Sequence, residues 1–197
     1  FYDRWHTFLR NHCGIDFVKV DGQSAISLAY GGMRTYGEAS REIQKGLNAS
    51  AALHFGNCII NCMGMASEDM WNRPSSAVSR SSDDFVPKEA NGFREHVIQN
   101  GYNNLLQGQF YWGDWDMFYT DHRENRCNSM LRAVSGGPVY VSDKVGETDP
   151  AFIWPLLRKD GRIIRCDKVG VPTMDCLLAD PLTSRQPLKI WNRYGAC

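Results

Sequence analysis

Short apolar stretches of the chain alternate with longer segments in which apolar residues recur every three to four positions. The helical spacing predicts five helices, over residues 1–13, 35–53, 92–106, 121–134 and 150–158. The short apolar stretches predict five strands, over residues 17–21, 57–62, 76–82, 109–112 and 138–141. This alternation is typical of an α/β fold, in which right-handed crossovers build a parallel sheet.

Polar and acidic residues follow the predicted strands. One strand ends in Asn61 and Cys62, and the others end in aspartate: Asp21, Asp83 with Asp84, Asp114 with Asp116, and Asp143. The carboxyl ends of parallel strands form the active-site face of a (β/α)8 TIM barrel, which is therefore the predicted fold. A doubly wound sheet is the alternative, but the chain lacks the glycine-rich nucleotide loops G-x-G-x-x-G and G-x-x-x-x-G-K-[ST].

A complete barrel has eight strands, so five strands predict its C-terminal half, strands four to eight. Residues 1–160 are expected to form this half of the catalytic barrel. Beyond them the chain is interrupted by Gly and Pro, and residues 188–192 alternate like a half-buried antiparallel strand. We therefore expect residues 161–197 to contain the barrel exit and the first strand or strands of a C-terminal β domain. The chain begins at Phe1 within a helical pattern, so we expect the N-terminal part of a longer protein to be missing.

The composition of the chain limits the partners and sites that we expect. The chain has 22 Lys and Arg against 22 Asp and Glu, which gives no indication of a nucleic acid or an anionic membrane as partner. No apolar run approaches the ~20 residues that span a bilayer. Seven cysteines form neither a regular framework nor a Cys-x-x-Cys pair, which favours free thiols and a cytoplasmic location. Cys58 and Cys62 have no histidine close in sequence, so we do not predict zinc there.

Lys19 and Asp21 are two residues apart, so their side chains point to the same side of the first predicted strand. A lysine inside a strand buried on both faces needs a partner, and Asp21 is the obvious candidate. The nearby cation would favour the ionised form of Asp21, as a nucleophile requires. The alternative interpretation is a structural ion pair.

Aspartates together with aromatic residues such as Trp112 suit a sugar, although packing is the alternative role for most of the aromatic side chains. Glycoside hydrolysis needs one ionised carboxylate and one protonated carboxylate. Asp83 and Asp84 are adjacent, and like charges so close disfavour joint ionisation, so one of them is a candidate acid/base. Arg80 would position the other carboxylate or the sugar. Lys19 and Arg80 already balance some of the acidic charge, and we expect no metal and no organic cofactor.

Several of these segments resemble a known family. Residues 17–21, Phe-Val-Lys-Val-Asp, resemble the Lys-x-Asp nucleophile strand of glycoside hydrolase family 36, the α-galactosidases, and their relatives. Longer segments resemble the branch that contains raffinose synthases, seed imbibition proteins and alkaline α-galactosidases; they are residues 79–85, 113–118, 136–143, 172–177 and 188–192. The likeness covers nearly the whole chain in order. It implies a retaining enzyme on a (β/α)8 barrel, flanked by β domains.

The resemblance also implies roles for individual residues. Asp21 takes the nucleophile position, and the acid/base motif Ser-Asp matches Asp83, with Asp84 as a close rival. Cys62 falls at the position on the fifth barrel strand that meets the sugar 2-hydroxyl, with Gly64 close behind. Asp114 and Asp116 are assigned to substrate binding; in an alternative assignment Asp114 is the acid/base.

The resemblance predicts a glycosidase that cleaves terminal α-linked galactose from oligosaccharides or glycoconjugates by double displacement. Gly22 stands where several plant members carry Val, and residues 63–71 differ from the plant pattern beside the 2-substituent. An α-N-acetylgalactosaminidase or α-galactosaminidase is therefore one alternative. A galactosyltransferase of the raffinose synthase type is another, because it uses the same glycosyl-enzyme. A catalytically silent sugar-binding barrel or an inert fragment is the alternative from a different class.

Overall fold

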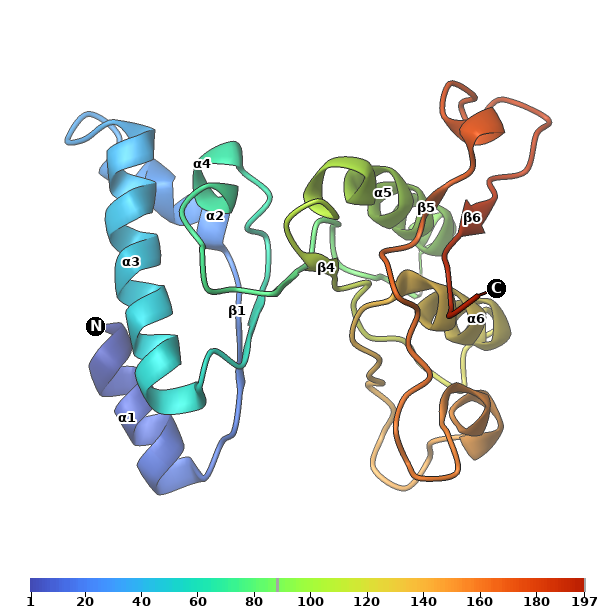
Figure 1. Cartoon of the computed structure of the whole chain (residues 1–197), viewed down its shortest axis with the longest axis horizontal. Coiled ribbons are helices and arrows are strands. Elements are labelled where there is room, and N and C mark those ends of the chain that lie inside the picture. The colour runs from blue at the N-terminus through green and yellow to red at the C-terminus, as the bar shows by residue number, and fades with distance from the viewer. Residues whose placement is uncertain (88, 197) are drawn as a thin grey trace. The chain divides into compact units, whose positions relative to one another are not determined.

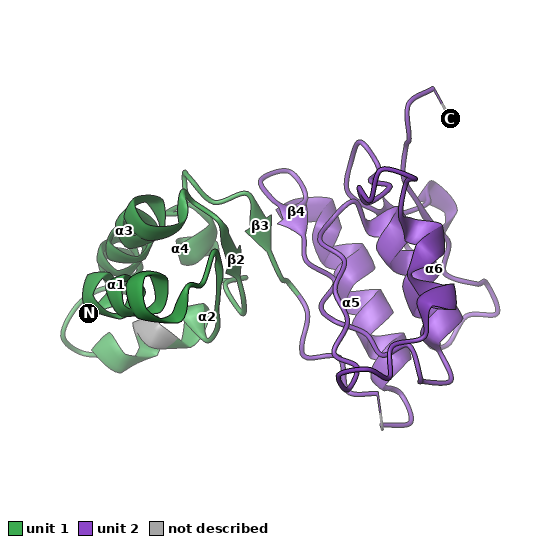
Figure 2. Ribbon diagram, turned by 90° about the horizontal axis from the view of Figure 1, so that it is seen from below, with its two compact units in different colours: residues 1–81 green, residues 82–197 purple. Residues whose placement is uncertain are grey.

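The computed structural model describes residues 1–87 and 89–196, which divide into two compact units, residues 1–81 and residues 82–197 (Figures 1 and 2). The first unit contains α1 (Tyr2–Cys13), β1 (Val18–Val20), α2 (Gln23–Ile26), η1 (Ser27–Tyr30), α3 (Tyr36–Phe55), β2 (Ile59–Asn61), α4 (Ser67–Met70) and β3 (Val78–Ser79). The second unit contains α5 (Gly92–Gln107), β4 (Trp112–Gly113), α6 (Asn125–Ser135), η2 (Pro150–Phe152), η3 (Trp154–Leu156), β5 (Val171–Pro172), η4 (Met174–Cys176) and β6 (Ile190–Trp191).

The strands of the first unit run parallel in the order β1, β2, β3. Val18 lies opposite Ile59, and Asn61 lies opposite both Val20 and Ser79. The helix α3 connects β1 to β2 and lies beside α1 (Figure 1). This arrangement confirms the predicted α/β class with parallel strands, whereas the closed eight-stranded barrel stays a prediction.

One apolar cluster holds α3 against the sheet. It consists of Val18 of β1, Ile59 of β2, and Leu47, Ala51 and Phe55 of α3. The spacing of the three α3 residues places them on one side of the helix, which explains why the helical period was readable in the sequence. The two ends of α3 are also encoded locally: Thr35 and Glu38 form a capping box at its start, and Gly56 ends it in the left-handed conformation.

The expectation that the first strand is buried on both faces is wrong. Phe17 is 56% exposed, and Lys19 and Asp21 are also exposed. Within the described residues, β1 pairs with β2 along one edge and with no strand along the other. Val18 alone of this strand is buried in the core, so Lys19 does not need a partner to offset a buried charge.

In the second unit, α5 begins and ends near its predicted residues and α6 begins four residues later than predicted, whereas the strands are shorter and the last predicted helix is replaced by turns. The strand expected over 138–141 is a single parallel bridge between Phe118 and Val141. The strand expected over 109–112 begins only at Trp112, because the amides of Phe110 and Tyr111 donate to the Gln107 carbonyl in a turn.

The helix expected over 150–158 is replaced by the two 3-10 turns η2 and η3. Pro155 would lie inside that helix, where its ring clashes with the preceding turn and it has no amide to donate.

The segment beyond residue 160 belongs to the second unit. Its strands β5 and β6 pair antiparallel, with Val171 opposite Trp191 and Pro172 opposite Ile190. Ile190 and Pro172 pack against Gly101 of α5. The predicted division between a barrel and a β domain at residue 160 stays a prediction.

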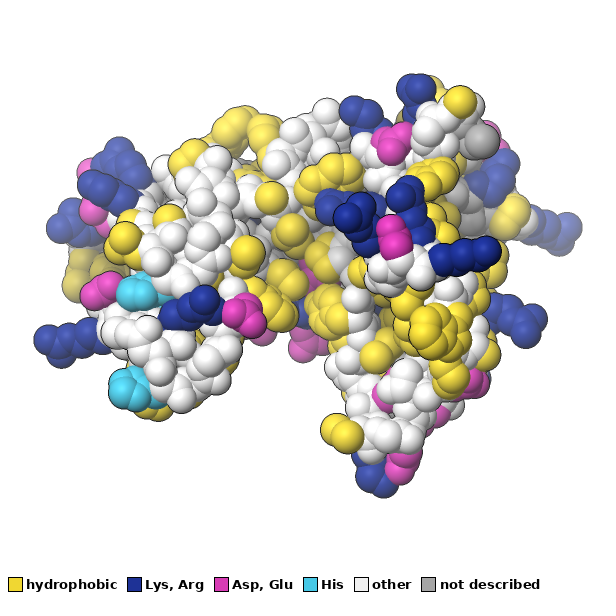
Figure 3. Space-filling model, turned by 60° about the horizontal axis from the view of Figure 1, so that its bottom comes forward, with side chains coloured by type: hydrophobic (Ala, Val, Ile, Leu, Met, Phe, Trp, Pro, Cys, Tyr) yellow, Lys and Arg dark blue, Asp and Glu magenta, His cyan; other side chains and the backbone are white. Residues whose placement is uncertain are grey.

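The surface gives no sign of a single large charged face in the view of Figure 3, where acidic and basic side chains are interspersed. Within the described residues, no helix is both long and apolar enough to cross a bilayer. The six described cysteines, Cys13, Cys58, Cys62, Cys127, Cys166 and Cys176, are free thiols, and Cys197 lies outside the described residues.

Candidate active site

Asp21 and Cys62 lie together at the carboxyl ends of two adjacent parallel strands. Asp21 follows β1 and Cys62 follows β2, and the Cys62 amide donates to the Val20 carbonyl at 2.9 Å. Parallel strands in register end at the same edge of a sheet, so residues 41 positions apart become neighbours. The Cys62 side chain is completely buried beside Asp21.

The surroundings of Asp21 favour its ionised form. Its pKa lies below the usual range, first because of the hydrogen bond from Cys62 and then because of the Gly22 amide, which donates to Oδ1 at 2.6 Å. The positive charges of Arg80 and Lys19 act in the same direction, whereas burial opposes them. Lys19 therefore acts as predicted, but its effect is the smallest of those that lower the pKa.

Arg80 is buried directly after β3, where its amide donates to the Asn61 carbonyl at 2.8 Å. Because Val20, Asn61 and Ser79 are paired across β1, β2 and β3, the next residues of the three strands, Asp21, Cys62 and Arg80, follow one another along the same edge of the sheet. Burial and the contact with Asp21 raise the pKa of the Cys62 thiol to about 12. The thiol therefore stays protonated at neutral pH and remains a donor.

A network of buried amides fixes the turn after Asp21. Gln23 donates from Nε2 to the Val20 carbonyl at 3.0 Å and to Asn61 Oδ1 at 2.9 Å. Gln44 of α3 donates to Gln23 Oε1 at 2.9 Å and to Asp69 Oδ1 at 3.2 Å. Sequence reasoning missed this network; its signal is the pair of polar residues, Gln44 and Asn48, on the side of α3 that also carries the apolar Leu47 and Ala51.

Arg73 anchors the segment after β2, for which the family resemblance predicts a position beside the sugar 2-substituent. Its guanidinium donates to the Gly64 carbonyl at 2.6 Å, to the Asp69 carbonyl at 3.2 Å and to Ser79 Oγ at 3.3 Å. A Cβ atom on Gly64 would lie 2.6 Å from Arg73 Nη1, so the close approach of this arginine depends on glycine there. Arg73 was also missed, because nothing in the local pattern distinguishes it from a surface arginine.

Asp83 and Asp84 open the second unit, and both side chains are exposed. Gln99 of α5 binds Asp83 twice, accepting from its amide at 2.6 Å and donating to Oδ2 at 3.0 Å. A hollow of about 100 Å³ adjoins both aspartates, and Glu95 and His96 of α5 also line it. The two candidate acid/base carboxylates thus border one polar hollow.

Asp114 and Asp116 are buried and share one partner. Tyr140 donates from its hydroxyl to Asp114 Oδ2 at 2.9 Å and to Asp116 Oδ1 at 3.3 Å, and the Asp116 amide donates to Asp114 Oδ1 at 3.0 Å. Asp116 has φ near 60°, which a short polar side chain tolerates. Its Oδ2 accepts from the Phe85 amide at 3.1 Å, which ties it to the residue after Asp84.

A buried cation lies beside this pair of carboxylates. Arg132 of α6 donates to the carbonyls of Asp116 and Met117 at 3.2 and 2.9 Å, and to Asn128 Oδ1 at 2.9 Å. Burial lowers the pKa of Arg132 to about 10, although both carboxylates oppose that effect. Sequence reasoning missed both Arg132 and Tyr140 as parts of the site.

Trp112, an aromatic residue predicted to bind the sugar, lies against an arginine side chain. The Arg165 guanidinium covers one face of its indole ring, 4.2 Å from the ring centroid, and also donates to the Gly136 carbonyl at 2.8 Å. Such a cation–π contact occupies that face of the ring. A sugar could therefore stack on this face of Trp112 only if Arg165 moved.

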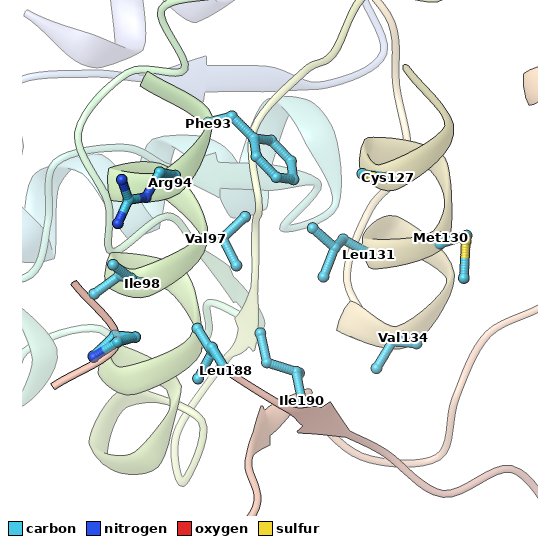
Figure 4. A pocket seen from close by; sticks show the side chains of 11 residues that line it. Phe93, Arg94, Val97, Ile98, Cys127, Met130, Leu131, Val134, Leu188 and Ile190 are labelled. Atoms are coloured by element: carbon cyan, nitrogen blue, oxygen red, sulfur yellow. The ribbon is translucent and has the colours of Figure 1, made fainter. Parts of the chain in front are cut away.

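A larger hollow of about 460 Å³ lies between α5, α6 and β6. Figure 4 shows apolar side chains pointing into it, among them Phe93, Val97, Leu131, Val134, Leu188 and Ile190. Apart from Arg94 its lining is apolar, so it lacks the partners that sugar hydroxyls require. Within the described residues there is also no cluster of three or more His, Cys, Asp or Glu side chains that could hold a metal ion.

Comparison with known proteins identifies a family to which this chain is similar. The sequence model of the family described as raffinose synthase or seed imbibition protein Sip1 matches residues 1–196. Two similar proteins are the probable galactinol–sucrose galactosyltransferase 6 of Arabidopsis thaliana, 37% identical over 194 residues, and the galactinol–sucrose galactosyltransferase of Oryza sativa subsp. japonica, 38% identical over 205 residues. The stachyose synthase of Pisum sativum is 35% identical over 210 residues.

These matches cover 97 to 98% of the chain but only 24 to 26% of each relative. The chain thus spans about a quarter of the length of these relatives.

Proposed function

The chain belongs to the family of raffinose synthases and the seed imbibition protein Sip1, and on that premise we propose that the protein transfers α-galactosyl groups between sugars. Galactinol is the proposed donor, and sucrose or a raffinose-type oligosaccharide is the proposed acceptor. The single observation that carries the proposal is Asp21, a carboxylate at the end of β1 that Cys62, Gly22, Arg80 and Lys19 keep ionised.

Transfer replaces hydrolysis as the favoured activity. The sequence first favours an α-galactosidase, whereas the similar proteins are named as galactosyltransferases and a stachyose synthase. Both activities pass through the same glycosyl-enzyme and differ in whether water or a sugar hydroxyl attacks it. The names of the relatives therefore support the transferase alternative, and the site chemistry is compatible with it.

Asp21 is proposed as the nucleophile. Its side chain is exposed, so a sugar can reach it, and its charge is held by two hydrogen bonds and two cations. In the first step a carboxylate oxygen of Asp21 forms a bond to the anomeric carbon while the bond to the leaving oxygen breaks. The product is a galactosyl ester of Asp21.

Asp83 is proposed as the acid/base, with Asp84 as the rival. The acid gives its proton to the leaving oxygen in the first step and takes a proton from the attacking acceptor hydroxyl in the second. That hydroxyl displaces Asp21 from the anomeric carbon, so two inversions retain the α configuration. Gln99 can keep the Asp83 side chain in one orientation during both proton transfers.

The remaining site residues are proposed to bind the donor sugar. Lys19, Arg80 and Cys62 surround Asp21, and hydroxyl groups of the galactosyl ring are their proposed ligands. Asp114 and Asp116 are proposed as further residues that bind the substrate. The sugar is proposed to stack on the face of the Trp112 ring opposite Arg165.

The test uses the complete protein with labelled galactinol and sucrose. Asp21→Asn should lower transfer at least ~1000-fold, because the amide cannot form the glycosyl ester. Asp16→Asn is the matched control, since Asp16 is exposed on the same segment and forms a surface ion pair with Arg10. Azide added to Asp21→Gly should restore donor cleavage and give the β-galactosyl azide.

Three outcomes would overturn parts of this proposal. Transfer that persists in Asp21→Asn would exclude Asp21 as nucleophile. Free galactose as the main product at high sucrose would return the assignment to a hydrolase, and a preference for 2-acetamido donors would favour the galactosaminidase alternative. Loss of activity in Asp84→Asn but not in Asp83→Asn would exchange the two acid/base candidates.

A further inference from the structure

We propose that Gln99 is a positioning residue for the proton transfers: it selects Asp83 rather than Asp84 as the acid/base and leaves Oδ1 of Asp83 to carry the proton. The inference deepens the proposed function and rests on it, because an acid/base has a task only if an anomeric bond is broken. It assigns the transferred proton to one carboxylate and to one of the two oxygens of that carboxylate.

Gln99 binds Asp83 at two points with one planar amide group. Its Oε1 accepts from the Asp83 main-chain amide at 2.6 Å, and its Nε2 donates to Oδ2 of the Asp83 side chain at 3.0 Å. A flipped Gln99 would turn its NH2 group toward a donor and its oxygen toward a carboxylate, so the two partners fix which end faces which atom. The Asp83 carboxylate therefore cannot rotate away without losing the second bond.

The helix α5 supplies Gln99 from a well-packed position. The next residue, Asn100, is 1% exposed and donates to the His96 carbonyl at 2.9 Å. His96 is itself buried, and its Nε2 contacts the Trp115 carbonyl at 2.8 Å. These contacts hold the part of α5 from which Gln99 reaches Asp83, 16 residues earlier in the chain.

The contact distinguishes the two oxygens of Asp83. The side chain is exposed, so a sugar hydroxyl can approach it. In the part of the chain that the structure describes, the hydrogen bond from Gln99 goes to Oδ2 and none goes to Oδ1. Oδ1 is therefore the oxygen that remains for a substrate. Asp84 is also exposed, but the two bonds of Gln99 both go to Asp83.

The same bond suits both protonation states of Asp83. An amide N–H donates to the carbonyl oxygen of a carboxylic acid and equally to an oxygen of a carboxylate, so Oδ2 keeps its partner while Oδ1 loses and regains a proton. In the first step the proton of Oδ1 moves to the leaving oxygen, which takes the electron pair of the broken anomeric bond. In the second step Oδ1 removes the proton of the acceptor hydroxyl, whose oxygen bonds to the anomeric carbon as the bond to Asp21 breaks.

The test compares two donors that differ in their need for an acid, using the complete protein. Galactinol releases an alcohol, which must be protonated, whereas α-galactosyl fluoride releases fluoride, which needs little help from an acid. Gln99→Ala should lower kcat/KM for galactinol roughly 10- to 100-fold, as expected for a lost hydrogen bond to a charged group. For the fluoride the loss should stay below about 3-fold, because bond cleavage there hardly depends on the acid.

Gln99→Glu separates the two contacts of Gln99. Its carboxylate can still accept from the Asp83 amide, but it turns a negative acceptor toward Oδ2, so it should lose at least as much activity with galactinol as Gln99→Ala does. Gln109→Ala is the matched control and should leave both donors unchanged. Gln109 is an exposed glutamine just beyond α5 and donates to the Leu105 carbonyl at 3.3 Å.

Asp83→Ala should show the same dependence on the donor at larger magnitude. Adding Gln99→Ala to Asp83→Ala should have no further effect, because both substitutions act on one proton transfer. Three results would each overturn the inference. They are equal losses with the two donors in Gln99→Ala, an unchanged kcat/KM for galactinol in that variant, and a donor-dependent loss in Asp84→Ala that is missing in Asp83→Ala.

The proposed function fails by a different result. If Asp21→Asn retains transfer, Asp21 is not the nucleophile, whatever Gln99 does. If Asp21→Asn is inactive while Gln99→Ala loses both donors equally or resembles the unchanged protein, the proposed function survives and only the role of Gln99 is wrong.

Discussion

His96 should make the folded chain sensitive to mild acid. This residue of α5 is 2% exposed, and its Nε2 contacts the Trp115 carbonyl at 2.8 Å. Burial, followed by repulsion from Arg132, lowers its pKa from 6.5 to about 4. The fold therefore accommodates the neutral ring. Protonation of His96 in the folded protein places a positive charge in a site that does not stabilise it.

The sign and size of the effect follow from linkage. Below pH 6.5 the unfolded chain binds a proton at His96 that the folded chain refuses until about pH 4, so stability falls as the pH falls through this window. A pKa depressed from 6.5 to about 4 corresponds to about 3 kcal/mol in total, of which about 2 kcal/mol should be lost by pH 5.

Urea unfolding between pH 7.5 and pH 5 measures this loss. In His96→Gln the side-chain amide can still donate to the Trp115 carbonyl, but it does not titrate. The difference between the two proteins should therefore shrink by about 2 kcal/mol on going to pH 5. Other groups, including His6 with its own lowered pKa, cancel in this difference. Parallel pH profiles for the two proteins, or a His96 ring that titrates near pH 6.5 by NMR, would refute the reasoning.

Two further predictions concern stability. Leu47→Ala should destabilise the first unit by about 2–5 kcal/mol because it opens a cavity in the apolar cluster under α3. The control Leu53→Ala lies on the same helix, where the side chain is 78% exposed, and should change the free energy of unfolding by less than about 0.5 kcal/mol. Equal unfolding midpoints of the two variants in urea would contradict this prediction. Arg132→Met should cost about 3–5 kcal/mol because it leaves the Asp116 and Met117 carbonyls and Asn128 Oδ1 without their buried donor, and the exposed Arg126→Met on α6 is the control for thermal unfolding. A cost similar to that of Arg126→Met would show that the fold does not need this donor.

The helices were predictable because their information is local. Leu47, Ala51 and Phe55 repeat at helical spacing, and Thr35 with Glu38 and the terminal Gly56 mark the two ends of α3. The strand positions were predictable for the same reason, although the hydrogen-bonded parts are only two or three residues long. The apolar spacing predicted one continuous helix over residues 150–158, but Pro155 prevents a continuous helix there.

The acidic residues of the candidate site could be proposed from the sequence, whereas their partners could not. Asp21, Asp83, Asp84, Asp114 and Asp116 were found because each follows an apolar stretch. The side chains that hold these carboxylates come from distant parts of the chain, as Gln99 does for Asp83 and Tyr140 for Asp114. Their local patterns are those of ordinary polar residues on helices and in loops.

By itself, the sequence determined the alternation of strands and helices, the capped ends of α3 and the aspartates after the strands, because periodicity and capping act over a few residues. Only the tertiary structure decided that Cys62 lies beside Asp21, and that Arg165 covers Trp112. Hydrogen bonds and cation–π contacts act over a few ångströms in space. Residues 41 or 53 positions apart therefore become partners only when the chain has folded.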